Sequence, residues 1–318
     1  MIYGFRPGPG GLTPVDPAAL GEALWIDLYS PLDSQIAAVE ALGVEIPTLA
    51  DMEEIEISNR LYREGDADYM TAVLPGELPD GTRLSMPVTF ILTKSRLVTV
   101  RHHTPRPFVT FPERAGKSVT GCHTSDRLLV GLTEEIIARQ ADILEGSGRV
   151  LDGITKDVFG GKNRGDPENF QRVLERIGVE SEVMAMVRLA LLSIERLLAF
   201  YTAGTDARPE AGRMKSVAKS QLRDIQALEV HADFLASRVG LTVDATMGMI
   251  NLQQNNTVRI LSVITALFLP PTLIASIYGM NFTHMPELDQ PWGYGMALGL
   301  MLGSGVATWL LLRWKKWL

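Results

Sequence analysis

Two long apolar runs near the C-terminal end constrain this chain more than any other feature of its sequence. Residues 260–282 and residues 293–312 contain no Asp, Glu, Lys, Arg or His. An α-helix of about 20 apolar residues crosses the roughly 30 Å hydrocarbon core of a bilayer. A buried hairpin in a soluble core is the alternative, but two such runs in succession favour two membrane-spanning helices.

Charged residues flank both runs in the pattern that is typical of membrane spans. The basic residues beside the runs are Arg259, Arg313, Lys315 and Lys316. The connecting segment has Glu287 and Asp289 but no Lys or Arg. Positively charged flanks stay in the cytoplasm, so the pattern predicts cytoplasmic termini and a short external loop in the cell (inner) membrane. The N-terminal segment has no apolar stretch of the signal-peptide type.

Composition and local motifs exclude several other classes of protein. With 30 Lys and Arg against 37 Asp and Glu, the net charge is −7, which argues against a nucleic-acid binder and leaves cations as partners. One cysteine, Cys122, cannot form an internal disulfide. The adjacent His102 and His103 end a predicted strand and would point to opposite faces, so they predict no metal pair. No set of nucleophile, base and acid can be assembled, and we expect neither an enzyme nor an organic cofactor.

The segment before the first apolar run is expected to be an α+β domain followed by a helical region. Short β-rich runs at 2–5, 24–28, 69–74, 88–93 and 97–102 alternate with short helical patterns at 31–42 and 47–56. From residue 125 the apolar spacing becomes helical, over 125–158 and again over 166–201. A further stretch without proline, 213–259, predicts a long stalk helix, which needs partners along its length.

The expected organisation is therefore an α+β cytosolic domain with a long helical stalk, followed by two C-terminal transmembrane helices. The boundaries are 1–124 for the α/β domain, 125–258 for the helical region, 259–282 for the first span, 283–292 for the external loop, 293–312 for the second span and 313–318 for a basic cytoplasmic tail.

A polar stripe runs along the first span. Its members follow one another at alternating spacings of three and four residues, so they share one face of a helix: Asn255, Val258, Ser262, Thr265, Leu269, Thr272 and Ser276. Small polar residues favour either close helix packing or the lining of a pore, and the stripe alone fits both. Two spans cannot enclose a pore, so pore lining requires a symmetric oligomer.

Pro270 and Pro271 interrupt the backbone hydrogen bonds near the middle of the first span. Membrane helices tolerate such breaks where hydroxyl side chains, water or neighbouring helices satisfy the freed carbonyl groups. We expect Thr272 and Ser276 to serve that purpose.

The first span ends in YGMNF, residues 278–282, within the longer segment FLPPTLIASIYGMNF, and MPEL, a GYGMALGLML span and a KKWL end follow. This order and spacing resemble the bacterial branch of the CorA family of magnesium and cobalt transporters. An acidic segment at 51–57 and MINLQQNN at 249–256 are also similar to that family. The resemblance covers the whole chain and is specific over roughly the last 70 residues.

The resemblance implies a funnel-shaped homopentamer whose pore is built from five copies of the first span. Gly279, Met280 and Asn281 would form the outer mouth, where amide and carbonyl oxygens face a hydrated divalent ion. Such a ring suits Mg²⁺, which dehydrates reluctantly. Glu287 and Asp289 in the external loop would raise the local cation concentration.

Carried over by position, the pore lining would consist of Asn255, Val258, Leu261, Thr265, Leu269, Thr272 and Ser276. Leu269, Leu261 and Val258 would be apolar constrictions that gate by excluding water, and Asn255 would form a second polar ring. The stripe alone selects Ser262 in place of Leu261, so that position stays open between the two. The family also senses internal Mg²⁺ with acidic residues, for which Asp224 and Asp233 are candidates.

The resemblance implies channel-like Mg²⁺ influx, with Co²⁺ and Ni²⁺ as lesser substrates and with gating by intracellular Mg²⁺. Mg²⁺ would then be both the transported and the regulatory ion, and the partners would be neighbouring copies, the bilayer and divalent cations, with no nucleic acid. A zinc transporter of the ZntB branch is one alternative. A membrane-anchored signalling or structural protein without transport is another. The PPTLIASIYGMNF context favours the magnesium branch.

Overall fold

The computed structural model describes residues 1–318 except 55, 79–81, 119, 161–166, 205–209, 281–284, 288, 316 and 318. The chain divides into two compact units. The first consists of Met1–Phe159 and Val173–Val243, and the second of Gly160–Arg172 and Asp244–Leu318. Each unit is described below by itself.

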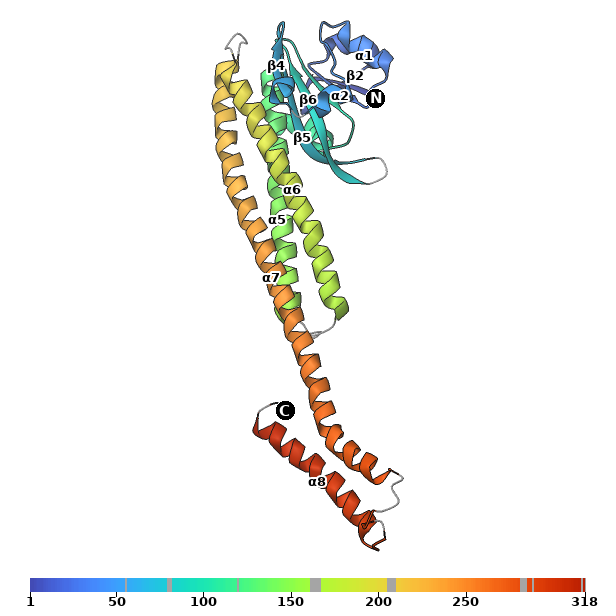
Figure 1. Ribbon diagram of the computed structural model, residues 1–318. Coiled ribbons are helices and arrows are strands. Elements are labelled where there is room, and N and C mark those ends of the chain that lie inside the picture. The colour runs from blue at the N-terminus through green and yellow to red at the C-terminus, as the bar shows by residue number, and fades with distance from the viewer. Residues whose placement is uncertain are drawn as a thin grey trace. The chain divides into compact units, whose positions relative to one another are not determined.

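The first unit contains a seven-stranded sheet in the order β2-β1-β3-β7-β6-β5-β4 (Figure 1). Strands β3 and β7 are parallel, and the other neighbouring pairs are antiparallel. The strands are β1 (Ile2–Gly8), β2 (Gly11–Val15), β3 (Trp25–Tyr29), β4 (Leu61–Glu64), β5 (Ala67–Glu77), β6 (Arg83–Leu92) and β7 (Leu97–Arg101).

Each of the five strand segments predicted from β-rich runs is a strand of this sheet. The two strands without a prediction, β2 and β4, are the short edge strands. Their sequences, GLTPV and LYRE, lack a β-rich apolar run. Each is joined to its neighbour, β1 or β5, by a tight turn. Pairing within that hairpin, and not the strand propensity of its own residues, makes each segment a strand.

The helices also follow the predicted pattern. Predicted helices 31–42 and 47–56 are α1 and α2, and the three long helical segments are α5, α6 and α7. The bounds are η1 (Pro17–Glu22), α1 (Asp33–Glu40), α2 (Leu49–Glu53), α3 (Ile57–Arg60), α4 (Arg106–Arg114), η2 (Ala115–Lys117), α5 (Ser125–Gly160), α6 (Pro167–Ala203), α7 (Ala211–Tyr278) and α8 (Gly293–Trp314).

Apolar residues cover both faces of the sheet. On one face, Ile26, Leu28 and Val98 pack with Val39 of α1 in a buried cluster. On the other face, the ring of Trp25 contacts Phe111 of α4 at a centroid distance of 5.7 Å. Helix α6 attaches to β5 because the Ser193 hydroxyl donates to Val73 O and accepts from Val73 N, both at 3.1 Å.

A buried polar network lies between the parallel strands β3 and β7. The indole of Trp25 donates to Thr99 Oγ1 at 3.0 Å, and the Thr99 hydroxyl donates to Asp27 Oδ1 at 2.7 Å. The guanidinium of Arg101 binds Asp27 through Nη2 at 2.9 Å and through Nε at 3.1 Å. Asp27 and Arg101 are almost fully buried, so each charge has its partner inside the same chain.

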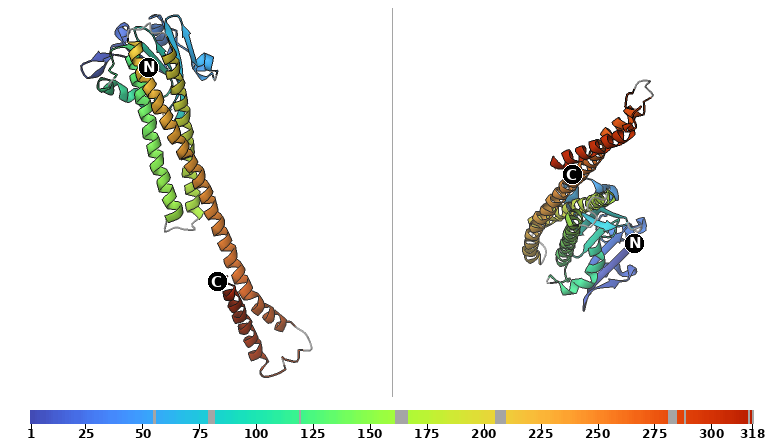
Figure 2. Two further views of the ribbon diagram at one scale, coloured as in Figure 1. Left: turned by 90° about the vertical axis from the view of Figure 1, so that its left-hand side faces the viewer. Right: turned by 90° about the horizontal axis from the view of Figure 1, so that it is seen from below.

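Helices α5, α6 and α7 run side by side through the first unit, as the views in Figures 1 and 2 agree. Buried Gln221 of α7 accepts from the Thr133 hydroxyl at 2.9 Å and donates to Val130 O at 2.9 Å. Nearer the other end of α5, Arg238 of α7 pairs with Asp152 at 2.7 Å. Helices α5 and α6 thus supply the partners that a helix as long as α7 needs.

Candidate functional site

The candidate site lies on the hairpin that α7 and α8 form in the second unit. Within the described residues, both helices contain a segment that is long and apolar enough to cross a membrane. A Cβ added at Gly305 of α8 would lie 3.8 Å from Pro271 Cγ of α7, so the helices meet at this level. Gly293, Ala297 and Leu312 are the buried residues of α8. Their spacing places one face of α8 against α7, and the small residues permit close approach.

Helix α7 has one partly covered and one uncovered face along this hairpin. The partly buried residues recur at helical spacing around the contact with α8: Val263, Ala266, Leu267, Pro270, Pro271, Ile274 and Tyr278. The opposite face carries residues that are all exposed: Val258, Leu261, Thr265, Leu269, Thr272 and Ser276. These six are the residues proposed from the sequence as pore lining, and the hairpin leaves them uncovered. Asn255, one turn before Val258, is exposed as well.

The uncovered face alternates apolar side chains with hydroxyl groups. Val258, Leu261 and Leu269 are each more than 60% exposed. The hydroxyl of Thr265 donates to Leu261 O at 2.9 Å, and that of Thr272 donates to Phe268 O at 2.7 Å. Because each hydroxyl hydrogen is held by the helix, the oxygen lone pairs remain as acceptors for water or a hydrated cation.

Ser262 and Leu261 are both exposed, and they differ in what they present. The Ser262 hydroxyl donates to Val258 O at 2.8 Å, in the same way as the two threonines. Leu261 presents only apolar atoms. Either residue can follow Val258 on the uncovered face. Leu261 would contribute an apolar surface there, and Ser262 would contribute a hydroxyl oxygen.

The proline pair frees the carbonyl oxygens of Ala266 and Leu267, four residues before each proline. The expectation that Thr272 would bind one of them is wrong, since its hydroxyl donates to Phe268 O. The reason is geometric: a threonine hydroxyl in a helix reaches the carbonyl four residues back, which here is Phe268.

The Gly-Met-Asn segment follows directly after α7. Gly279 N donates to Ala275 O at 2.9 Å, and Met280 N donates to Ile277 O at 3.3 Å. A Cβ at Gly279 would lie 3.1 Å from Ala275 O, which is closer than ordinary contact, so glycine fits the turn best. Asn281 lies outside the described residues. The structure therefore places two residues of the motif at the end of the uncovered face.

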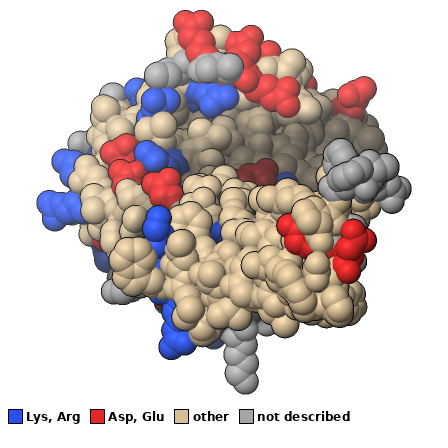
Figure 3. Space-filling view, turned by 60° about the horizontal axis from the view of Figure 1, so that its bottom comes forward, with Lys and Arg blue, Asp and Glu red and all other residues tan. Residues whose placement is uncertain are grey.

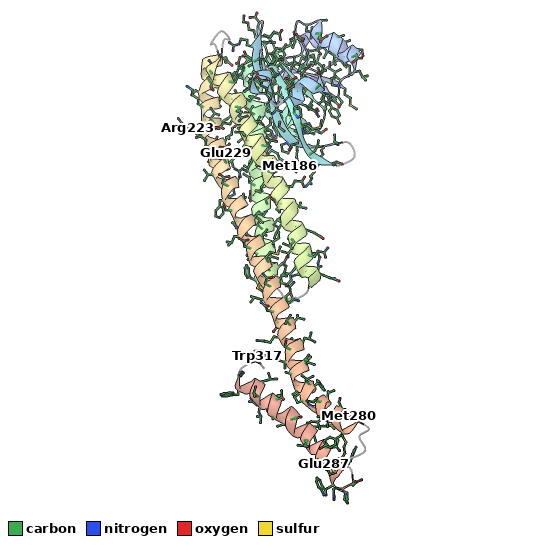
Figure 4. The ribbon with its side chains drawn as sticks, in the orientation of Figure 1. Met186, Arg223, Glu229, Met280, Glu287 and Trp317 are labelled. Atoms are coloured by element: carbon green, nitrogen blue, oxygen red, sulfur yellow. The ribbon has the colours of Figure 1, made fainter. Side chains whose placement is uncertain are left out.

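The acidic residues of the connecting loop lie near the same end of the hairpin. Figure 4 shows Met280 where α7 ends and Glu287 where the chain approaches α8. Glu287 is half-buried and Asp289 is exposed. In the described part of the chain neither carboxylate has a basic partner within ion-pair distance. Their charges are therefore available to attract cations to this end of the hairpin.

The two proposed regulatory residues differ in their surroundings. Asp233 of α7 pairs with Arg188 of α6 at 3.0 Å, and both side chains are more than half exposed. Asp224 is exposed. A cavity of about 370 Å³ adjoins the pair between α6 and α7 and is lined by Ser181, Met184, Ala185, Arg188, Ala236 and Val239. Asp233 is thus held by a cation of its own chain.

Sequence reasoning missed Glu229, which lies close to Asp233 and is labelled in Figure 4. Burial raises the pKa of Glu229, and the neighbouring Glu195 and Asp233 raise it further, while Arg188 opposes them. The spacing of Glu229 and Asp233, four residues apart on one helix, was the signal that could have identified it. Across the described ranges, no three His, Cys, Asp or Glu residues are arranged to hold a metal ion.

Comparison with known proteins now defines the family. A model of the family described as CorA-like Mg²⁺ transporter protein matches residues 21–316. The chain belongs to this family. It is 31% identical over 322 residues to the magnesium transport protein CorA of Haemophilus influenzae, with full coverage of both chains.

Solved structures of other proteins have the same fold over most or all of this chain. The complete CorA magnesium transporter from Methanocaldococcus jannaschii superposes with a TM-score of 0.78 at 17% identity, covering 100% of this chain and 99% of that one. The cytoplasmic domain of ZntB from Vibrio parahaemolyticus gives a TM-score of 0.58 at 9% identity, over 78% of this chain and 97% of that domain. The predicted fold class is confirmed: an N-terminal α/β domain, a long helix and two C-terminal apolar helices.

Family membership confirms the resemblance proposed from the sequence. It places this CorA-family protein among membrane transporters, as the sequence predicted. In Figure 3, which brings the bottom of Figure 1 forward, tan residues form a broad surface without Lys, Arg, Asp or Glu side chains. Such a surface fits a protein with membrane-embedded helices.

Proposed function

We propose that this CorA-family protein conducts Mg²⁺ across the cell (inner) membrane through a pore lined by α7. The uncovered face of α7 carries the proposal. Its apolar and hydroxyl side chains are exposed in a segment that membrane lipid or other protein must cover. Family membership and the magnesium transport protein of Haemophilus influenzae, which matches over its full length, support Mg²⁺ as the cargo.

A pore requires several copies of the chain, because one hairpin cannot surround an aqueous path. We propose five, as the resemblance to the family implies. Exposed apolar residues on α7 in the first unit support self-association, because Val230, Phe234 and Leu241 are 71%, 57% and 70% exposed. Solvent contact at such residues is unfavourable by roughly 25 cal/mol for each Å² of apolar surface. Burying them against neighbouring copies removes that penalty.

The proposed path begins at the ring formed by Gly279, Met280 and Asn281. The backbone carbonyls and the Asn281 amides would hydrogen-bond the waters of a hydrated Mg²⁺ without removing them. Below it, the acceptor oxygens of Ser276, Thr272 and Thr265 alternate with apolar rings. Leu269, Leu261 and Val258 would form the constrictions, with Asn255 as a final polar ring; Ser262 in place of Leu261 would add a hydroxyl ring instead. Apolar rings of this kind gate by excluding water.

The proposed topology places the spans at 259–282 and 293–312 and both termini in the cytoplasm. The loop at 283–292 would then be external, where Glu287 and Asp289 raise the concentration of cations at the pore mouth. The basic tail at 313–318 would remain inside, in agreement with the distribution of positive charge.

We also propose that Co²⁺ and Ni²⁺ are lesser substrates and that intracellular Mg²⁺ closes the pore. Asp224 and Asp233 remain the proposed sensing residues. Since Asp233 already pairs with Arg188 at 3.0 Å, an incoming Mg²⁺ would have to displace that guanidinium. Sensing at Asp233 would thus replace its ion pair with Arg188 by a contact between the Asp233 carboxylate and Mg²⁺.

Side-by-side uptake of Mg²⁺, Co²⁺, Ni²⁺ and Zn²⁺ into proteoliposomes tests the proposal. We expect Mg²⁺ uptake, weaker uptake of Co²⁺ and Ni²⁺, and inhibition by Mg²⁺ on the side of the α/β domain. Uptake of Zn²⁺ alone would favour the ZntB-type alternative. A correctly assembled protein that admits none of the four ions would contradict transport altogether.

A further inference from the structure

The C-terminal end of α8 combines basic and tryptophan side chains. No Asp or Glu follows Asp289 in the sequence. Over the described residues, Arg313 and Lys315 form no ion pair. Trp314 is 81% exposed and Trp317 52% exposed, and Figure 4 shows Trp317 beside the C-terminal end of α8. Among the described residues, no acidic side chain pairs with the basic residues at this end of the helix.

The guanidinium of Arg313 is held in place by the ring of Trp309. Its central carbon lies 5.2 Å from the ring centroid, a distance at which a cation and an aromatic face attract each other. The two residues are four positions apart, so they are neighbours on one face of the helix. Among the described residues, the N–H groups of this guanidinium form no hydrogen bond, so they remain available. The N–H edge of a guanidinium matches two oxygens of a phosphate group.

An exposed apolar stripe leads along α8 to this cation. Leu302 is 72% exposed, Val306 56% and Trp309 40%, and Arg313 follows at the same helical spacing. Spacings of four, three and four residues keep these side chains on one face. The buried residues Ala297 and Leu312 belong to the face that meets α7. The stripe therefore consists of apolar side chains from Leu302 to Trp309 and ends at the positive charge of Arg313.

We propose that this stripe is a binding site for an anionic phospholipid. The headgroup phosphate binds Arg313, and the acyl chains lie along Val306 and Leu302. A phospholipid with net negative charge fits best, because a zwitterionic headgroup carries its own ammonium group that competes for the phosphate. Tryptophan at the level of the headgroups is the usual arrangement at membrane interfaces. The site is separate from the pore face on α7 and does not depend on which cation is transported.

Native mass measurement on the full-length protein tests the site. The purified assembly is titrated with phosphatidylglycerol, with phosphatidylcholine of identical acyl chains, and with inorganic phosphate as a soluble competitor. We expect phosphatidylglycerol to be retained preferentially, with Arg313→Gln lowering its affinity roughly fivefold, the contribution of one basic residue at an anionic surface. Arg259→Gln is the matched control: it removes one positive charge beside the apolar part of α7 and should leave retention unchanged.

Two further variants keep the test informative if Arg313→Gln fails to assemble. Trp309→Leu keeps the charge and an apolar side chain but removes the ring, so phosphatidylglycerol affinity should fall while assembly persists. Arg313→Lys keeps the charge without the planar edge and should bind with intermediate affinity. Equal retention of both lipids, or a loss in Arg259→Gln as large as in Arg313→Gln, contradicts the site. Displacement of phosphatidylglycerol by millimolar inorganic phosphate would show that free phosphate, and not a lipid, is the ligand.

Discussion

Helix α7 is one continuous helix, yet its two ends treat their polar side chains in different ways. In the first unit, Gln221 is buried, and both the oxygen and the nitrogen of its amide find partners on α5. In the second unit, Thr265 and Thr272 donate to their own helix and leave their oxygen atoms exposed. The amide of Gln221 therefore has its hydrogen-bond partners within one chain. The hydroxyl oxygens of Thr265 and Thr272 can accept only from water, from a hydrated ion or from another copy of the chain.

This difference separates residues that maintain the fold from residues that carry the function. A polar group with its partners inside the chain contributes to the free energy of unfolding, and its loss leaves an unpaired buried group. A polar group that is open to the outside contributes little to folding and is free to interact with a passing cation. Variants of the two kinds should therefore affect different measurements, which the following predictions test.

The largest expected effect is on transport, from Asn281→Ala at the end of the uncovered face. Five amides would be lost from the pore mouth at once, each with a hydrogen bond to water of about 1 kcal/mol, so Mg²⁺ uptake should fall roughly a thousandfold. Assembly should persist because the span keeps its length and apolar character. Proteoliposome uptake and native mass measurement check the two parts.

Asn256→Ala is the control for that variant, since it removes the same amide from a residue outside the proposed lining. Its uptake should match that of the parent. If Asn281→Ala transports Mg²⁺ at the parental rate in an intact assembly, the motif is not the selectivity element.

The next largest effect is on stability, from Arg101→Met in the closed network of the sheet. The variant leaves the Asp27 carboxylate buried without its cation, and the α/β domain should lose about 4 kcal/mol of unfolding free energy. Urea titration of the full-length protein with pulse proteolysis measures that loss. Arg6→Met removes a partner of the exposed Arg6–Glu22 pair and should change little. Mg²⁺ uptake by Arg101→Met, normalised to the amount of folded protein, should equal that of the parent. A lower value would contradict the separation between residues that maintain the fold and residues that carry transport.

The sequence predicted the spans and the central strands because both depend on local patterns. Uncharged runs of membrane length at 260–282 and 293–312, and β-branched segments such as LVTVR, carry their structure in adjacent residues. The edge strands β2 and β4 were missed because pairing with a neighbour, and not composition, makes them strands. Strand β7 ends at Arg101, so His102 and His103 follow the strand instead of ending it; His103 is fully buried and His102 is partly exposed.

Contacts between distant segments were the part that the sequence did not provide. Asp27 and Arg101 are 74 residues apart, and no local pattern joins them. One signal was present, since each is a charged residue within an apolar strand, and buried charges need partners. The pair between Arg188 and Asp233 gave no such signal because both lie on polar helix faces. For the candidate site, the stripe was predictable from helical spacing, while its exposure required knowledge of where α8 packs.

Acidification should lower the unfolding free energy of the α/β domain through protonation of His103. Its Nε2 donates to Leu74 O at 2.8 Å, while Nδ1 is buried without a partner among the described residues. Burial, helped by the nearby Arg101 and His102, lowers the pKa of His103 to about 4, although the hydrogen bond to Leu74 O opposes the shift. The unfolded chain binds a proton below about pH 6.5, but the folded chain does not until about pH 4. Stability should therefore fall by up to about 3 kcal/mol between these values and level off below.

Unfolding measurements between pH 7 and pH 4 on the parent and on His103→Gln isolate this contribution. The glutamine keeps a donor for Leu74 O but does not titrate, so its stability should depend less on pH. Burial also lowers the pKa of His102, which adds a smaller loss of the same sign in both proteins. The raised pKa of Glu229 acts in the opposite direction in both. If the unfolding free energy depends on pH equally in the two proteins, His103 does not cause the loss of stability.

A more modest effect on transport is expected from Leu269→Ala in the apolar part of the uncovered face. Leu269 is 64% exposed, and five copies facing one another would narrow the pore and exclude water. Shortening the side chain should raise the basal Mg²⁺ leak by roughly threefold to tenfold, measured at high internal Mg²⁺ when the pore is closed. Ile264→Ala removes an aliphatic side chain from a different face of the same span and should leave the leak unchanged. Equal leaks in both variants would mean that Leu269 is not a constriction.

The smallest expected effect concerns Arg188, which holds the proposed sensing residue Asp233. Replacing Arg188 by Gln removes the cation that an incoming Mg²⁺ would have to displace, so half-maximal Mg²⁺ protection against protease should occur at a concentration a few-fold lower. The pair is exposed and water screens it, which limits the shift. Arg238→Gln, which breaks the pair of α7 with Asp152, is the matched control and should leave the Mg²⁺ dependence unchanged. An equal shift in both variants would indicate a general loosening of the helices. No shift in Arg188→Gln would show that Mg²⁺ does not compete for Asp233, and the sensing role would then fall to residues outside this pair.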